Sequence, residues 1–211
     1  MKRMLQYIFL SVFVCSFAVA QAESPSKTLE ISLAGGMSYP YLPGDFKNYS
    51  KKGTNIEGGI GYSLQPGSLG YGALSLNVGY STFSFDQSAF QSSGSPMSAN
   101  TTISSIKMLT ATATFKGIFS KTKKSIAPYF LLGAGAFYTM TDTTVSTSAN
   151  PPSSNITTDR TIAMTWTLGA GLNFPVTERI GLFVEGRYVM CVTGNLGRQY
   201  FPVNVGLLVR P

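Results

Sequence analysis

The chain has 211 residues, with 16 basic and 9 acidic side chains, a formal net charge of +7 and no histidine. Without histidine, the Ser-His, Cys-His and Asp-His pairs that hydrolytic sites use for proton transfer are excluded, so we expect a protein that is not an enzyme. The positive charge is mild and is not arranged as a basic stripe, which argues against binding of nucleic acid.

The first residues have the layout of a secretory signal peptide. Two basic residues precede an apolar run at 7–19, and small residues that suit a cleavage site end at Ala22. The apolar run is shorter than the roughly 20 residues that a membrane-spanning helix needs. We therefore predict export, with residues 1–22 as the signal peptide and residues 23–211 as a single mature domain.

Eight segments of the mature domain place apolar residues at every second position, with small or polar residues between them. Because alternate side chains of a β-strand point to opposite sides, each segment predicts a strand with one apolar face and one polar face. The predicted strands, in chain order, are Leu29–Tyr41, Thr54–Leu64, Leu74–Ser81, Leu109–Lys116, Ile126–Tyr138, Ile162–Phe174, Ile180–Met190 and Tyr200–Arg210.

The connections between the predicted strands alternate in length. Bacterial barrels place their short turns in the periplasm and their long loops outside the cell, so we expect both termini to be periplasmic. The long connections are rich in Ser, Thr, Asn and Pro, a composition that stays solvated. The short connections are 66–69, 120–125 and 175–179, and the long ones are 42–53, 84–102 and 139–159.

An even number of such strands suits a membrane barrel. In hydrocarbon every backbone polar group must be paired within the protein, and strands achieve this only in a closed barrel. Aromatic residues such as Tyr80 and Tyr138 near strand ends suit the headgroup region of a bilayer. We predict an all-β fold, an eight-stranded antiparallel up-and-down transmembrane β-barrel. The alternative is a soluble barrel that turns its apolar face inward around a ligand.

Three segments also carry a resemblance to a known family. PYFLLGAGAFY at Pro128–Tyr138, LGAGLNF at Leu168–Phe174 and GLFVEGRYVM at Gly181–Met190 resemble the OmpA/OmpX-type small outer-membrane barrels, the outer membrane protein beta-barrel domain. The resemblance covers essentially the whole mature chain and implies an outer-membrane location. Its implied partners are outer-membrane lipid, lipopolysaccharide and the assembly machinery. Family members commonly end in an aromatic residue, whereas Arg210 and Pro211 stand here, so we expect atypical recognition by that machinery.

The polar face of the predicted strands carries charged residues. An eight-stranded barrel is just wide enough for side chains to fill its interior, and charges there must be paired to avoid a heavy desolvation penalty. We therefore predict a salt-bridged plug inside the barrel rather than an open pore. The charged residues expected to form it are Glu30, Glu57, Lys116, Glu185 and Arg187.

Two further features concern binding. Lys47, Lys51 and Lys52 crowd the first long connection and could contact lipopolysaccharide or host polyanions, although a simply solvated loop explains them as well. Cys191 is the sole cysteine of the mature domain, so we expect no disulfide within the chain. Because it has no Cys or His partner for a metal site, we expect neither a metal nor a cofactor.

The leading interpretation is a non-enzymatic outer-membrane protein with a structural role, whose long loops contact host molecules or other cells. The first alternative is a narrow porin-like channel for small solutes. The second is a soluble periplasmic or secreted carrier of apolar ligands. A filled interior favours the leading interpretation, because it leaves no path for water.

Overall fold

The computed structural model describes residues 28–66, 70–91, 101–120, 125–147, 153–192 and 197–211. The expected signal peptide lies outside the described residues. Within the described ranges, no helix is both long enough and apolar enough to cross a membrane.

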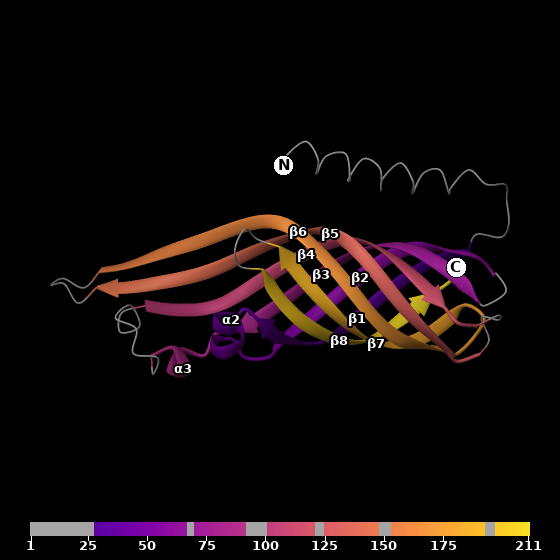
Figure 1. The fold of residues 1–211 in the computed structure, drawn as a ribbon, viewed down its shortest axis with the longest axis horizontal. Coiled ribbons are helices and arrows are strands. Elements are labelled where there is room, and N and C mark those ends of the chain that lie inside the picture. Colours follow the sequence, from indigo (N-terminus) through magenta and orange to yellow (C-terminus); the bar gives the residue numbers. More distant parts are fainter. Residues whose placement is uncertain (1–27, 67–69, 92–100, 121–124, 148–152, 193–196) are drawn as a thin grey trace.

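Eight antiparallel strands close into one barrel in sequence order, and β1 pairs with β8 to complete the ring (Figure 1). The predicted fold is confirmed. Most of the strands are longer than the alternation of apolar and polar residues predicts. Their bounds are β1 Thr28–Leu42, β2 Gly53–Pro66, β3 Tyr71–Ser84, β4 Thr101–Ile118, β5 Ala127–Thr147, β6 Ser153–Pro175, β7 Ile180–Val192 and β8 Arg198–Val209.

The two faces of the barrel wall differ in chemistry as the alternation predicts. Apolar side chains point outward and are widely exposed, for example Leu76 at 65% and Ile162 at 75%. Polar side chains such as Thr114 and Asn204 point into the lumen and are buried. A soluble protein would leave this large apolar exterior in water, whereas a transmembrane barrel places it against lipid.

The ends of the barrel are unequal. At one end, which we call the terminal end, β1 begins, β8 finishes and short connections join β2 to β3, β4 to β5 and β6 to β7. At the other, the hairpin end, β5 and β6 extend beyond the remaining strands (Figure 1). Their pairing continues from Thr139 opposite Thr161 as far as Thr147 opposite Ser153.

This pairing corrects the expectation of a long irregular connection at 139–159. Most of that segment is strand, and only residues 148–152 separate β5 from β6. Threonine is β-branched and favours extended backbone. The segment lies past the apolar band, so neither of its faces needs to be apolar. The alternation that identified the other strands is therefore missing here.

The first two connections at the hairpin end are joined to each other. They contain two short helices, α2 at Gly44–Tyr49 and α3 at Gln87–Gln91. The N–H of Lys51 donates to the carbonyl of Ser84 at 2.8 Å, and the N–H of Asp86 donates to the carbonyl of Tyr49 at 2.6 Å. We call α2, α3 and these links the cap. It is a built structure rather than a solvated loop.

Candidate functional site in the barrel interior

An arginine holds two carboxylates together in the middle of the lumen. Nη1 and Nη2 of Arg187 donate to Oε2 and Oε1 of Glu57, both at 2.7 Å. Nη2 also forms an ion pair with Oε1 of Glu185 at 2.5 Å. Arg187 is only 4% exposed and Glu185 only 1%. This two-pronged geometry is the strongest form of arginine–carboxylate pairing.

A lysine and a tyrosine complete this group from the neighbouring wall. Nζ of Lys116 lies 3.8 Å from Oε2 of Glu185, and the hydroxyl of Tyr129 donates to the same oxygen at 2.8 Å. The ammonium also lies 5.0 Å from the ring centroids of Tyr129 and Phe183, within cation–π range. Two cations therefore balance two carboxylates. We call Glu57, Lys116, Glu185 and Arg187 the central charge cluster.

Glu30, the fifth residue of the expected plug, lies apart from this cluster. Nε of Arg210 donates to its Oε1 at 2.9 Å, and both side chains are almost fully buried near the terminal end. Sequence reasoning missed Arg210 as the partner of Glu30 and Tyr129 as a partner of Glu185. Tyr129 and Arg210 both stand at positions that the alternation assigns to the lumen, and this placement was the signal that could have identified them.

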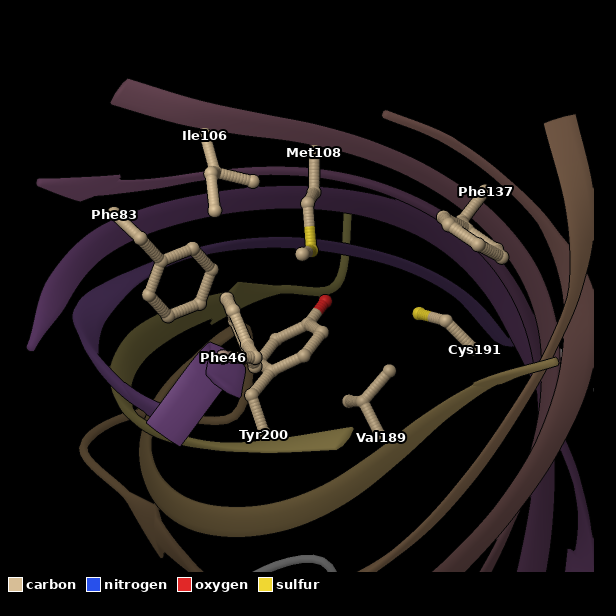
Figure 2. Close-up of a cluster of buried hydrophobic side chains, with 8 residues drawn as sticks. All are labelled: Phe46, Phe83, Ile106, Met108, Phe137, Val189, Cys191 and Tyr200. Carbon is tan, nitrogen blue, oxygen red and sulfur yellow. The ribbon is translucent and has the colours of Figure 1, made fainter. Parts of the chain in front are cut away.

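Towards the hairpin end the lumen is filled by apolar side chains, which sequence reasoning also missed. The ring of Phe46, carried by α2, lies 5.1 Å from the ring of Phe83, which lies 5.5 Å from that of Tyr200, in edge-to-face contacts. Figure 2 shows these rings pointing toward one another inside the barrel. We call the whole cluster the apolar plug, and its members are Phe46, Phe83, Ile106, Met108, Phe137, Val189, Cys191 and Tyr200.

Little space remains between the apolar plug and the central charge cluster. A cavity of about 30 Å³ lies there, bordered by Glu57, Arg187, Tyr200 and Asn204. This volume accommodates roughly two water molecules. It is far below the roughly 300–1,000 Å³ of typical small-molecule sites. The site can therefore hold charges and a little water in fixed positions, but it is too small for a solute.

The lysines of the first connection occupy different environments. Nζ of Lys51 lies 3.5 Å from the Asp86 carboxylate and so helps to hold the cap. Asp86 also accepts hydrogen bonds from the Ser88 hydroxyl at 2.6 Å and the Ala89 N–H at 3.2 Å, and these bonds lower the pKa of Asp86. Lys47 and Lys52 are exposed.

The buried thiol of Cys191 provides a test of how firmly the apolar plug closes the lumen. We expect Cys191 in the folded protein, produced as residues 23–211, to react very slowly with a water-soluble maleimide. Phe46→Ala removes the ring that α2 inserts into the lumen. Truncating a buried phenylalanine lowers folding stability by several kcal/mol, so the apolar plug should open more often and the reaction should be about tenfold faster or more. Rates of maleimide attachment, followed by mass spectrometry, measure this.

The matched control for this experiment is Phe119→Ala, which truncates an exposed phenylalanine away from the apolar plug. Its labelling rate should equal that of the wild type. A wild-type rate as fast as that of the chain unfolded in urea would contradict a closed plug.

Comparison with known proteins places this barrel in a family. The outer membrane protein beta-barrel domain matches residues 7–207. No curated protein matches the sequence. Among solved structures, Neisserial surface protein A is similar with a TM-score of 0.50 and 16% identity, over 90% of this chain and 100% of that one.

Two further barrels are more distant in structure. Ail of Yersinia pestis has a TM-score of 0.44 and 15% identity, over 87% of this chain and 99% of that one. The outer membrane enzyme PagL has a TM-score of 0.45 and 14% identity, over 86% of this chain and 99% of that one. At these identities the likeness concerns the fold alone. The family match, in contrast, spans nearly the whole sequence, and the chain belongs to the outer membrane protein beta-barrel domain family.

Proposed function

We propose that this outer-membrane barrel is a non-enzymatic surface protein with a structural role, exported by the signal peptide at 1–22 and folded over 23–211. Its terminal end lies in the periplasm and its hairpin end faces outward. The two longest connections, 43–52 and 85–100, and the extended β5–β6 hairpin all lie at the hairpin end, and they support this orientation because bacterial barrels keep short turns on the periplasmic side. The absence of histidine from the sequence supports a role without proton-transfer catalysis.

The filled lumen supports this role over the alternatives. The central charge cluster and the apolar plug occupy successive levels of the lumen, and the cavity between them measures about 30 Å³. A channel would need a continuous water path. A soluble carrier would need an apolar interior with room for its ligand and a polar exterior. The exposed side chains of the barrel wall are instead predominantly apolar.

The observation that carries the surface role is the backbone edge of β6 at the hairpin end. β6 pairs with β5 back to Ser153, but its pairing with β7 begins only at Met164. Between these two residues, β6 has no second strand partner among the described residues. An open edge of this kind is a template for an extended segment of another protein. We therefore expect the protruding hairpin to take part in contacts with other cell surfaces.

A second contact involves the exposed lysines of the cap. Lys47, Lys51 and Lys52 lie close together in the sequence and could attract a polyanion such as the sugar-phosphate part of lipopolysaccharide or a host polysaccharide. Lys51 also pairs with Asp86. The exposed pair Lys47 and Lys52 is therefore the main source of attraction.

Shortening the β5–β6 hairpin tests the surface role. Thr143 and Thr157 face each other across the two strands, so residues 144–156 can be replaced by an Asn-Gly turn, which suits a two-residue hairpin. The barrel should still form, because its apolar band is untouched. Adhesion of cells carrying the protein to surfaces coated with extracellular-matrix protein should fall to the level of cells lacking it.

The matched comparison is Lys47→Gln/Lys52→Gln, measured on the same surfaces and on heparin. This variant should keep adhesion to matrix protein and lose retention on heparin. If both variants adhere as the wild type does, the surface role is wrong and a purely structural role remains. The compact band of unboiled protein on a gel verifies that each variant folds.

A further inference from the structure

Charged side chains in the strands of this barrel point almost entirely inward. Among the strand residues whose side chains the structure describes, two exceptions occur, Lys107 on β4 and Arg160 on β6. Lys107 stands between Ile106 and Met108, which are buried in the apolar plug, so it faces outward. Arg160 is exposed two positions before the outward-facing Ile162. The inward-facing charges are Glu30, Glu57, Lys116, Glu185, Arg187 and Arg198.

The strand register brings these two cations to the same place on the barrel wall. Lys107 pairs with Met140 on β5, and Met140 pairs with Arg160 on β6. Directly paired residues share one face of a sheet. Two strand spacings separate their backbones by about 10 Å, and both side chains are long enough to meet over Met140. Residues 53 positions apart in the sequence thus form one cationic site.

This site sits directly on the edge of the apolar band. One outward position further along each strand lie Leu109, Tyr138 and Ile162, which are themselves paired in register. Leu109 and Ile162 are exposed apolar residues, and tyrosine prefers the level of the lipid headgroups. The outward face therefore changes from apolar to cationic where the hydrocarbon of a bilayer gives way to its headgroups.

Hydroxyl groups continue the site along the same register row. Thr82 on β3 pairs with Lys107, and its Oγ1 lies 3.1 Å from Oγ1 of Thr54 on β2. Hydroxyls are donors to phosphate oxygens in the same way as ammonium and guanidinium groups. Lys107 has a further contact within the protein, and an ammonium group carries three hydrogen-bond donors.

We propose that Lys107 and Arg160 bind a phosphate group of a membrane lipid, namely a phosphorylated glycolipid of the outer leaflet. Arg160 offers the planar fork that matches phosphate oxygens, and Lys107 adds a compact positive charge. The acyl chains of the same lipid then lie against Leu109 and Ile162. The choice of leaflet rests on the proposed function, because it requires the hairpin end to face outward.

Binding of diphosphoryl lipid A to the purified protein in a neutral detergent tests this site. The test variant is Lys107→Gln/Arg160→Gln, and the control is Arg179→Gln, which removes an exposed positive charge between β6 and β7 at the terminal end. The wild type and the control should bind with equal affinity in native mass spectrometry. The test variant should bind about tenfold more weakly or worse, because it loses charge-assisted bonds to phosphate. Arg160→Lys should give an intermediate loss.

Three results would overturn the proposal. The first is equal binding by the test variant and the control. The second is equal affinity of the wild type for lipid A whose phosphates have been removed. The third is full competition by millimolar inorganic phosphate, which would make the site one for free phosphate. Since the measurement uses purified protein in detergent, a failure of the adhesion experiment leaves its outcome unchanged, and the reverse also holds.

Discussion

Replacing Arg187 with alanine is expected to lower the stability of the folded barrel by about 3–5 kcal/mol, because it leaves buried carboxylates without their cation. Both Glu57 and Glu185 use Arg187 as a partner, and Glu185 is almost fully buried. Lys116, at 3.8 Å from Glu185, cannot replace the two short bonds to Glu57. The measurement is the urea or heat midpoint of the compact, unboiled form in detergent.

Two companion variants separate charge from packing. Arg160→Ala removes an arginine that is exposed on the outside of the barrel, and it should shift stability by less than about 0.5 kcal/mol. The triple variant Arg187→Met, Glu57→Gln, Glu185→Gln removes the charges together and should recover most of the loss. If Arg187→Ala unfolds at the same midpoint as Arg160→Ala, the central charge cluster does not stabilise the barrel.

Alanine at Gly36 should prevent the barrel from closing properly, whereas alanine at the adjacent Gly35 should be tolerated. Gly36 lies on β1 opposite Asn204 of β8, at the seam where the first and last strands meet. A Cβ atom there would lie 1.9 Å from the carbonyl oxygen of Val203 and 2.8 Å from Oδ1 of Asn204. A Cβ atom on Gly35 would have its nearest contact at an ordinary 3.6 Å, from the carbonyl oxygen of Asn55.

The expected cost of Gly36→Ala is at least about 1–3 kcal/mol, the usual range for overpacking a tight interior. The fraction of compact, unboiled protein after refolding should fall for Gly36→Ala and remain at the wild-type level for Gly35→Ala. Because the two glycines are neighbours on opposite faces of one strand, local helix or strand propensity is the same for both. Equal refolding of the two variants would refute the close approach of β1 and β8.

The strands could be predicted because lipid and lumen impose opposite demands on alternate residues. That signal covers the segments in the apolar band, such as Ile162–Phe174, and it disappears in the polar extension of β5 and β6. The apolar plug was missed because its side chains do not follow the rule that polar residues face the lumen. Phe83 and Phe137 face inward although they are apolar, so polarity there does not distinguish the lumen from the exterior.

Pairing inside the lumen depends on register and on the curvature of the closed wall. The sequence alone places Glu30 and Glu57 on the polar face, but it does not say which cation each one meets. Glu30 pairs with Arg210 and Glu57 with Arg187. These choices follow from how far each strand is displaced along its neighbours, summed around the ring. Assigning residues to the two faces of the predicted strands therefore identifies the charged residues but not all of their partners.

The Arg187–Glu57 bond joins positions that are 130 residues apart. It can form only after β8 has paired with β1, because β7 reaches β2 across that seam, so these charges stabilise the barrel only when the ring closes. A sheet that enters the bilayer before it curls would hold the same groups unpaired against lipid. We therefore expect half-built forms to be disfavoured and the meeting of distant strands to be the slow step of insertion.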